Sequence, residues 1–473
     1  MFESYLSPGT ALMILLVFGA FWVAFGAWLG RGNRSLDDFM LAGRNVGFAL
    51  AAATAMATWV TSNTTMVAPQ LTYQLGVWGM VGYALGAVGL ILFAPLAGRI
   101  KTLLPAGFTS GDFIRKRYGK LAWRVFLIIS LFYSLGWLIS LGMAGGLLVN
   151  ALSGLDYHIG MSVILAVCVG YTLLGGLRAV IATDFIQTLI ILFGIVWLAW
   201  LVMDNMSFEQ LHTAVQEERP ELLNLLFPAA IMFLFNNLFF GVGEIFHSNV
   251  WWSRAFAFGE GVGVKAYLLA GLLWMPIPIV AGFVALAAPA LGIVVPSADM
   301  VGPLVAGKLL GTTGAVIVFL VVFAALASSL DSVLAATADL ITQDIYRGHI
   351  KPEASSEHLF KAGKIIMLLL GFVTWLLCLP KLTTLGSLLH FTGAFVASAI
   401  WPVLFGLYDP RAGGGTAAVA MLCGTVAGLL GYFLIGFYVA ALVAAAVSLI
   451  IMRVGMQLRP GAFDFQQLRQ SSS

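Results

Sequence analysis

Residues 323–347 read FAALASSLDSVLAATADLITQDIYR and place polar groups inside an otherwise apolar segment. Two adjacent hydroxyls, Ser328 and Ser329, are followed closely by the carboxylate of Asp331. Hydrocarbon solvates neither hydroxyls nor charges, so polar groups at this depth usually face a protein interior, an ion path or a substrate path. Paired hydroxyls are also hard oxygen ligands of the kind that an alkali cation needs. The segment therefore predicts an ion site in a membrane helix.

The composition of the whole chain indicates an all-α integral membrane protein. Hydrophobic residues make up 60% of the 473 positions, charged residues only 10%, and the mean hydropathy is +0.98. These values lie outside the range of soluble globular domains. The sequence predicts one transmembrane domain over residues 1–456 and a short cytoplasmic tail over residues 457–473. About thirteen segments are long enough to cross a bilayer, at roughly 20 residues for about 30 Å of hydrocarbon: 10–30, 46–73, 77–99, 122–152, 159–177, 179–203, 222–250, 264–292, 311–343, 360–380, 384–407, 414–434 and 436–456.

The basic residues predict the orientation of the chain. With the N-terminus outside and the C-terminus in the cytoplasm, all but three of the 24 Lys and Arg fall on the cytoplasmic side. The three exceptions are Arg219, Lys308 and Lys381, whereas the cytoplasmic set includes Arg34 and Arg254. This asymmetry is what the positive-inside rule describes. It favours an odd number of spans in a plasma membrane or bacterial inner membrane, and it attributes the net charge of +3 to topology and not to nucleic-acid binding.

The sequence contains no pattern typical of an enzyme. No Ser–His–Asp set, metal-ligand cluster or phosphate-binding loop is evident, and the six His and three Cys are widely scattered. Cys168, Cys378 and Cys423 all lie in apolar spans without paired spacing, which is typical of small buried hydrophobic residues. We therefore expect neither catalysis nor an organic cofactor, and no required protein partner is evident.

Two spans carry polar residues at their centres, which predicts helices that are broken within the membrane. The second span contains Thr-Trp-Val-Thr-Ser-Asn-Thr-Thr over residues 58–65, and the seventh contains FFGVGEIFHSN over residues 239–249. Hydrogen-bonding side chains can satisfy backbone groups that local unwinding frees, which lipid cannot do. Because these spans are five apart, they predict a transporter of two inverted repeats, about 46–203 and 222–407, with its site at mid-membrane.

Two motifs resemble the signatures of the sodium:solute symporter family. The first is formed by Gly175-Gly176, Ala179-Val180, Thr183-Asp184 and Gln187. The second begins at Ser328-Ser329 and continues through Asp331-Ser332 to Asp344-Ile345-Tyr346. The order and separation of the two motifs also agree with the family, and the resemblance spans about residues 35–410.

The resemblance implies a LeuT-type five-helix inverted-repeat core and a sodium site where the second span meets the ninth. Ser328 and Ser329 match hydroxyl ligands of that site, Ala325 matches a carbonyl ligand, and Ala57 and Val60 match carbonyl donors of the second span. About five hard oxygens without a fixed charge would bind Na⁺ reversibly. In the same family, the acidic residue at the position of Asp184 is associated with the sodium exit route.

Several stretches resemble the urea-transporting branch of the family: residues 73–79, 83–84, 98–101, 267–274, 344–346 and 350–354. Residues 248–254 depart from the pattern of that branch, and Glu244 stands where the branch tends to carry a neutral residue. Both paired hydroxyls are present, whereas plant and fungal urea members tend to lose one of them, and this favours sodium over proton coupling. We expect urea as the solute. The alternative is another small solute, such as an amino acid, a carboxylate or an amine.

Further residues in these spans are candidates for binding the solute or gating its path: Trp59, Thr61, Asn63, Trp78, Tyr83, Asn237, Glu244 and His247. Each also has a structural interpretation. Trp and Tyr are common in membrane spans as packing residues or interface anchors. Glu244 and His247 are one turn apart and could pair with each other, because an intramembrane glutamate is costly unless paired or protonated. Asp331 could equally be an acid hydrogen-bonded between helices, and serine hydroxyls often bond to the backbone one turn back.

These features predict a sodium-coupled symporter that works by alternating access. Sodium would bind between the second and ninth spans, and a small polar solute would bind between the second, third, seventh and eleventh spans. The coupling would arise from the different affinities of the two ligands for two conformations. A transporter-like membrane sensor is the alternative from another class, although the tail is too short to hold a signalling domain. Sodium-dependent uptake of solute into vesicles would distinguish the two.

Overall fold

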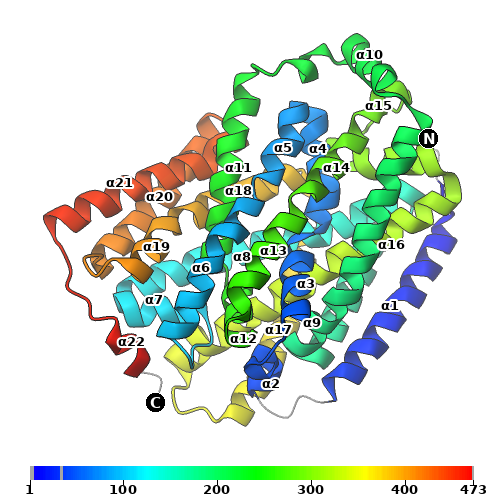
Figure 1. Ribbon diagram of the computed structural model, residues 1–473. Coiled ribbons are helices and arrows are strands. Elements are labelled where there is room, and N and C mark those ends of the chain that lie inside the picture. The colour runs from blue at the N-terminus through cyan, green and yellow to red at the C-terminus, as the bar shows by residue number, and fades with distance from the viewer. Residues whose placement is uncertain (1–4, 32–35, 471–473) are drawn as a thin grey trace.

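Long apolar runs fold into helices throughout residues 5–31 and 36–470, the part of the chain that this computed structural model describes (Figure 1). No strand forms within these residues, so the all-α prediction is confirmed. The α-helices are α1 (Pro8–Gly30), α2 (Leu36–Leu41), α3 (Phe48–Trp59), α4 (Ser62–Leu75), α5 (Val77–Ala84), α6 (Ala87–Leu103), α7 (Ser110–Tyr118), α8 (Lys120–Ser153), α9 (Tyr157–Asn205), α10 (Phe208–Glu218), α11 (Pro228–His247), α12 (Asn249–Ala257), α13 (Val262–Trp274), α14 (Pro276–Ala285), α15 (Ala287–Ala290), α16 (Val301–Leu340), α17 (Ser356–Cys378), α18 (Leu385–Ser398), α19 (Ile400–Tyr408), α20 (Gly414–Leu434), α21 (Ala440–Leu458) and α22 (Gln466–Gln470). Shorter 3₁₀ and π segments are η1 (Ala42–Arg44), η2 (Pro220–Leu223), η3 (Ala298–Met300), η4 (Ile341–Ile350) and η5 (Phe437–Val439).

Eleven helical segments among the described residues are long and apolar enough to cross a membrane. One of them, α9, has 49 residues. At 1.5 Å per residue its length is about 74 Å, more than twice the roughly 30 Å of a bilayer core. The α3–α4 pair is absent from the eleven because each half is short. If α9 counts as two crossings and the α3–α4 pair as one more, the eleven segments become thirteen crossings. The number of thirteen crossings stays a prediction.

The long helix α9 changes direction at Gly176, inside the first sequence motif. Gly176 has φ 60° and ψ −168°, a conformation that residues with a Cβ rarely adopt. A Cβ built at this position would lie 2.5 Å from a ring carbon of Phe39. Both observations require glycine here, so the motif marks the turn between two membrane crossings.

Both spans that were predicted to be broken are interrupted. The helix of the second span ends at Trp59, where Val60 has φ −82° and ψ 87°, and it resumes as α4 after Thr61. The seventh span is interrupted at Ser248, which has φ −70° and ψ 132° between α11 and α12. Polar residues at the centre of the second span therefore identified its break, whereas in the seventh span the break lies near the end of the predicted 222–250 segment.

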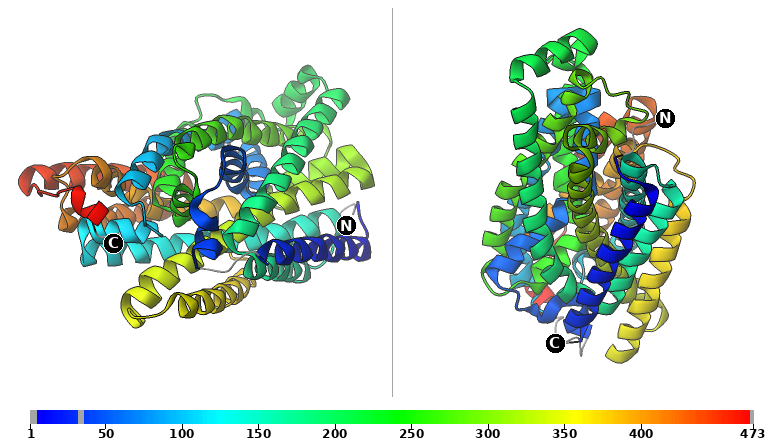
Figure 2. Two further views of the ribbon diagram at one scale, coloured as in Figure 1. Left: turned by 60° about the horizontal axis from the view of Figure 1, so that its bottom comes forward. Right: turned by 90° about the vertical axis from the view of Figure 1, so that its right-hand side faces the viewer.

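The break between α3 and α4 lies in the interior of the bundle. In Figure 2 the blue helices of this pair are enclosed by the other helices. Helix α3 packs against α9, α13 and α16, and α4 packs against α8, α14 and α16. Every residue from 57 to 64 is buried. The backbone groups at the break are therefore shielded from lipid.

The two ends of the described chain lie at opposite faces of the bundle (Figure 1, and right panel of Figure 2). This arrangement agrees with an odd number of crossings, while the assignment of the faces to outside and cytoplasm stays a prediction. The predicted tail folds back onto the bundle: the Phe463 N–H donates to the Pro410 carbonyl (3.1 Å), and the Arg117 guanidinium lies 4.3 Å from the Phe463 ring centroid. Arg34 and residues 471–473 lie outside the described residues.

Candidate functional site

A capping box formed by Thr61 and Thr64 holds the break between α3 and α4. The Thr61 N–H donates to Thr64 Oγ1 (3.1 Å), and the Thr64 N–H donates to Thr61 Oγ1 (3.1 Å). In a continuous helix these two N–H groups would bond to the carbonyls of Ala57 and Val60, four residues earlier. The box therefore frees those two carbonyls at the C-terminal end of α3, where the helix dipole favours a cation.

The hydroxyls of α16 meet this end of α3. Ser329 Oγ donates to the Ala325 carbonyl one turn back (3.0 Å) and is within bonding distance of the Thr58 carbonyl on α3 (3.2 Å). Ser328 Oγ is buried and forms no hydrogen bond within 3.5 Å among the described residues; it interacts with the Asp184 carboxylate over a longer distance. Leaving a buried polar group unpaired costs about 1–3 kcal/mol, and such groups are rare in native proteins. The Ser328 hydroxyl is therefore the atom of this junction that points most directly to a bound ligand.

The residues predicted to bind sodium gather at this one junction of α3 and α16. The donor set consists of backbone carbonyls and hydroxyls and contains no fixed charge. Such oxygens suit Na⁺, which proteins hold with hard, neutral ligands. Within the described residues, no group of three or more His, Cys, Asp or Glu side chains could hold another metal ion. The residues present thus fit sodium, and its binding here stays a prediction.

A buried arginine pairs with Asp184 next to this junction, on the side of the break that α3 occupies. Arg254 Nη2 lies 3.4 Å from Asp184 Oδ2, and neither side chain is exposed. The same nitrogen donates to Thr58 Oγ1 (2.6 Å) and to Ser332 Oγ (2.7 Å). Arg254 Nε donates to Thr54 Oγ1 (3.1 Å), and Thr54 in turn donates to Asp184 Oδ2 (2.6 Å). We call these five residues the arginine cluster.

The arginine cluster corrects one sequence-based expectation. Arg254 was counted among the basic residues of cytoplasmic loops, but it lies in α12 and is fully buried. A hydropathy pattern cannot show that polar groups from three other helices surround it. Asp184 is also fully buried, and its carboxylate is bonded to Arg254 and Thr54.

Asp331 is bonded on both carboxylate oxygens. The Tyr171 hydroxyl contacts Asp331 Oδ2 (2.8 Å) and the Ala327 carbonyl (2.9 Å). Ser332 Oγ lies 3.2 Å from Asp331 Oδ1 and 2.7 Å from the Ser328 carbonyl. These contacts link α9 to α16 and favour the structural interpretation of this acid.

A pocket opens on the other side of the break, next to the start of α4. Its lining residues come from α3, α4, α5, α8, α11, α13 and α18: Trp59, Thr61, Asn63, Tyr83, Gly86, Tyr133, Trp137, Asn237, Phe240, Trp274 and Leu389. We call it the aromatic pocket. Its free volume is about 20 Å³, little more than the roughly 10–15 Å³ that one water molecule needs. A solute larger than water therefore requires the lining side chains to move apart.

Three buried polar atoms of the aromatic pocket form no hydrogen bond within 3.5 Å among the described residues: Trp59 Nε1, Asn63 Nδ2 and Tyr133 Oη. The Tyr133 hydroxyl also interacts with the Glu244 carboxylate behind the lining. Asn63 Oδ1 accepts a bond from Ser140 (3.0 Å), which leaves the amide nitrogen as the unused donor. Asn237 differs, because its amide donates to the Gly82 carbonyl (2.8 Å). No charged side chain lines the pocket. The unused groups are thus two N–H donors and one hydroxyl, which suit a neutral polar solute.

Five of the eight predicted solute or gating residues line the aromatic pocket: Trp59, Thr61, Asn63, Tyr83 and Asn237. The other three lie elsewhere. Trp78 donates to a backbone carbonyl in the connection before α11 (2.8 Å). Both oxygens of Glu244 accept from the Trp251 indole (3.0 Å each), and His247 bonds to Ser130 (2.7 Å). Glu244 and His247 therefore use other partners and form no hydrogen bond with each other.

Sequence reasoning missed the pocket residues of the fourth and eighth spans. Tyr133 and Trp137 come from α8, and Trp274 comes from α13. The Trp274 indole also donates to the Trp59 carbonyl (2.6 Å), and this bond stabilises the end of α3. Aromatic residues in apolar spans are common, and the spacing of Tyr133 and Trp137 by four residues was the available signal that they share a helix face.

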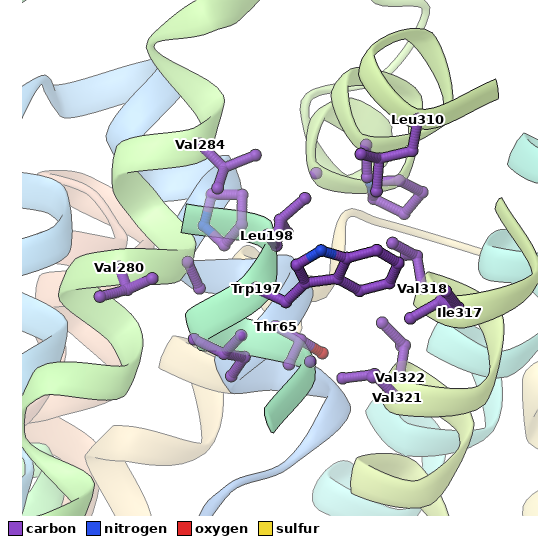
Figure 3. A pocket seen from close by; sticks show the side chains of 17 residues that line it. Thr65, Trp197, Leu198, Val280, Val284, Leu310, Ile317, Val318, Val321 and Val322 are labelled. Carbon is purple, nitrogen blue, oxygen red and sulfur yellow. The ribbon is translucent and has the colours of Figure 1, made fainter. Parts of the chain in front are cut away.

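A second pocket is larger and almost wholly apolar (Figure 3). It has a free volume of about 40 Å³ between α4, α9, α14 and α16, and Trp197, Val280 and Leu310 are among its lining residues. Its single lining hydroxyl, that of Thr65, contacts the Ser62 carbonyl (3.1 Å). The Trp197 indole N–H is its other lining polar group, so this pocket offers a polar solute fewer groups than the aromatic pocket does.

Two broken helices around a buried mid-bundle pocket define a secondary transporter of the membrane. The sequence profile of the sodium:solute symporter family matches residues 39–424, and the chain belongs to this family. It is accordingly a transporter and not an enzyme, as the sequence predicted.

Curated relatives of two kinds align with most of the chain. The urea-proton symporter DUR3 of Oryza sativa subsp. japonica is 27% identical, over 89% of this chain and 64% of that protein. The urea active transporter of Saccharomyces cerevisiae is 25% identical, over 82% of this chain and 57% of its own length. The chain thus spans less than two thirds of these urea transporters. The osmoregulated proline transporter OpuE of Bacillus subtilis is 27% identical, over 90% of this chain and 88% of that protein.

Solved structures share the fold. A Na⁺-coupled sialic acid symporter in a substrate-bound, outward-open state superposes with a TM-score of 0.79 at 19% identity, covering 96% of this chain and 98% of that one. The nucleobase-cation symporter Mhp1 in a closed conformation gives a TM-score of 0.57 at 17% identity, covering 93% and 99%. The LeuT-type fold implied by the sequence motifs is confirmed, whereas the repeat boundaries stay predictions.

Proposed function

We propose that this protein is a sodium-coupled symporter that imports a small neutral polar solute, with urea as the leading candidate. One observation carries the proposal: buried side-chain polar atoms that form no hydrogen bond within 3.5 Å occur on both sides of a single helix break. On one side this is the Ser328 hydroxyl, next to the carbonyls whose helical N–H partners the capping box takes. On the other side they are the unused donors of the aromatic pocket. A sodium ion and a solute bound side by side would supply partners to both sets of polar atoms.

The proposed coupling follows from the shared break. Trp59 lines the aromatic pocket, and the next residue, Val60, carries one of the freed carbonyls. Sodium at the end of α3 would therefore fix the backbone that positions the Trp59 indole for the solute. Each ligand would then favour the conformation that the other prefers, which is the physical basis of symport by alternating access. In this account, sodium leaves past Asp184.

The chemistry of the aromatic pocket favours urea among small solutes. The N–H groups of Trp59 and Asn63 suit a carbonyl oxygen, and the Tyr133 hydroxyl suits an amide N–H. The lining contains no charged side chain to pair with a carboxylate or ammonium group. Relatives from rice and yeast that carry urea in their names support the same choice.

An amino acid such as proline is the second candidate. Thr61 is the N-cap of α4 and lines the aromatic pocket, so the N-terminus of this helix opens there. Helix N-termini bind carboxylates through free N–H groups and the helix dipole. The relative from Bacillus subtilis, which matches over most of both chains, is a proline transporter by name.

We propose Na⁺ and not H⁺ as the coupling ion because both Ser328 and Ser329 are present at the junction with α3. The rice relative is a proton symporter by name, so the two ions need to be compared directly. We further propose a plasma membrane or bacterial inner membrane location, with the N-terminus outside and the C-terminus in the cytoplasm.

Uptake into proteoliposomes tests the proposal. An inward sodium gradient should drive accumulation of labelled urea, and a proton gradient of equal size without sodium should not. Excess unlabelled urea should abolish the signal, whereas proline should leave it unchanged. Accumulation of labelled proline that urea does not inhibit would favour the second candidate. Failure of every solute to accumulate would favour a sensor.

A further inference from the structure

Arg254 joins four helices beside the proposed sodium site. From α12 its guanidinium reaches Thr54 and Thr58 on α3, Asp184 on α9 and Ser332 on α16. Its Nη1 also donates to the Val250 carbonyl within α12 (3.2 Å), which fixes the direction of the side chain. A planar guanidinium with five donors can hold such a divergent set of oxygens, and a lysine ammonium cannot.

The arginine cluster closes the space between α3 and α16 directly below the sodium ligands. Thr58 follows Ala57 in the chain, and Ser332 lies one turn after Ser328. The hydroxyls of Thr58 and Ser332 are 3.2 Å apart, in hydrogen-bonding contact, so no ion fits between them. Arg254 Nη2 donates to both hydroxyls and holds them in this arrangement. For a sodium ion to leave past Asp184, the hydroxyls of Thr58 and Ser332 must move apart.

The two helices that Arg254 connects most directly are halves of broken spans. Helix α3 ends at the break after Trp59, and α12 begins after the interruption at Ser248. Short non-helical segments of this kind are where hinge motions are absorbed. Asn249 at the start of α12 strengthens the connection, since its amide donates to the Ala336 carbonyl of α16 (2.9 Å) and accepts from the Ser110 N–H of α7 (2.9 Å).

A buried ion pair is a poor device for stability alone. Removing two charges from water often costs more than their attraction returns, and apolar replacements are frequently neutral or stabilising. The pair between Arg254 and Asp184 is fully buried. The other Asp184 oxygen, Oδ1, forms no hydrogen bond within 3.5 Å among the described residues, and the Ser328 hydroxyl interacts with this carboxylate. Asp184 is therefore next to a proposed sodium ligand while Arg254 is bonded to its Oδ2.

We propose that Arg254 is a latch that holds the sodium release path shut. With the guanidinium in place, α3, α9, α12 and α16 are tied together and the path beyond Ser328 is closed. When α12 swings away, Arg254 leaves the hydroxyls of Thr58 and Ser332, and Asp184 becomes available to the departing ion. The inference rests on the proposed function for the identity of that ion, but not for the closure itself.

Cysteine accessibility tests the latch without transport. A reporter cysteine is placed by Ala336→Cys, in a background where the three native cysteines are replaced by alanine. Ala336 is only 3% exposed and lies beside Asn249, so a hydrophilic maleimide should label the purified protein slowly. Adding Arg254→Gln should raise the labelling rate at least tenfold. Arg254→Lys should raise it about threefold, because an ammonium keeps the charge but not the set of bonds.

The matched control is Arg117→Gln. Arg117 is a second buried arginine, but it donates to the carbonyls of Gly406, Asp409 and Ala412, away from the sodium ligands. Its removal should leave the labelling rate within about twofold of the parent. A folded, monodisperse Arg254→Gln protein that labels as slowly as the parent would overturn the latch. Failure of both Arg254 variants to fold, while the control folds, would also overturn it and assign Arg254 a purely structural role.

The same assay separates the latch from the proposed function. Sodium should slow labelling of the parent and of both Arg254 variants, because it stabilises the closed arrangement of α3 and α16. A large effect of Arg254→Gln with no response to sodium would keep the latch and remove sodium as the ion. A sodium response with no effect of Arg254→Gln would overturn the latch and keep sodium as the ion.

Discussion

The two sides of the α3–α4 break use similar polar residues in opposite ways. On the α4 side, the Tyr133 hydroxyl is buried and forms no hydrogen bond within 3.5 Å among the described residues, beside the unused donors of Trp59 and Asn63. On the α3 side, the Tyr171 hydroxyl contacts both Asp331 and a backbone carbonyl. Arg254 likewise has all three nitrogens bonded. The aromatic pocket therefore keeps unused polar groups for a solute, whereas the Tyr171 and Arg254 networks beside the proposed sodium ligands are already bonded.

This difference separates binding from closure in physical terms. An unpaired buried polar group lowers the stability of the fold by about 1–3 kcal/mol, and a ligand that bonds to this group removes that penalty. A satisfied network gains nothing from a ligand and instead resists being pulled apart. The Ser328 hydroxyl is the exception on the α3 side, because it forms no hydrogen bond within 3.5 Å among the described residues, and there it is available to sodium.

The largest effect should come from Ser328→Ala. Loss of one oxygen ligand to a cation is worth about 1.5–3 kcal/mol, the value of a hydrogen bond to a charged group, so the half-saturating sodium concentration should rise about 10- to 100-fold. Sodium-dependent urea uptake at a series of sodium concentrations measures this change. The control is Ser448→Ala, another fully buried serine, which donates to the Ser398 carbonyl far from the break. Equal sodium dependence in both variants would remove the Ser328 hydroxyl from the site.

The two tyrosines should respond in opposite ways to loss of the hydroxyl. Tyr133→Phe removes a hydroxyl that forms no hydrogen bond within 3.5 Å and has only a longer interaction with Glu244, so the thermal midpoint should change little. The half-saturating urea concentration should rise about 2- to 12-fold, the equivalent of about 0.5–1.5 kcal/mol for a neutral hydrogen bond. Tyr171→Phe leaves an Asp331 oxygen without its donor and should lower stability by about 1–3 kcal/mol, with urea affinity unchanged.

Thermal unfolding and uptake measured on both tyrosine variants test this pair. If Tyr133→Phe lowered the melting temperature as much as Tyr171→Phe, the aromatic pocket would be packing and not a solute site. If Tyr171→Phe alone weakened urea binding, the solute would lie on the α3 side of the break.

The smallest effect should come from Trp78→Phe. The Trp78 indole donates to a backbone carbonyl before α11 and does not line the aromatic pocket. Half-saturating concentrations of sodium and urea should therefore stay within about twofold of the parent. A tenfold change in urea affinity in this variant would extend the solute site beyond the aromatic pocket.

The sequence was sufficient to predict the broken helices, because Thr, Ser and Asn crowded at the centre of an apolar span need hydrogen-bonding partners that lipid cannot supply. It also placed Ala57, Val60, Ser328 and Ser329 through the family motifs, and the structure brings α3 and α16 together at these positions. The carbonyls that the capping box frees follow from a local backbone rule and could have been found from Thr61 and Thr64 alone.

The remaining site residues depend on packing between distant segments. Arg254 was assigned to a loop because a local pattern does not show that α3, α9 and α16 surround it. Glu244 and His247 were one turn apart but bond to Trp251 and Ser130 instead of to each other. Side-chain partners in a bundle are set by neighbours that are far away in the sequence, and no local periodicity encodes them.

Reciprocal binding tests the central claim, that two coupled ligands occupy the two sides of one break. The affinity of the purified protein for urea is measured by tryptophan fluorescence, since Trp59, Trp137 and Trp274 line the aromatic pocket. Saturating sodium should tighten urea binding by about 5- to 150-fold, the usual range of a coupling free energy, and potassium should not. Urea should tighten sodium binding by the same factor. Equal urea affinity in sodium and in potassium would contradict the account.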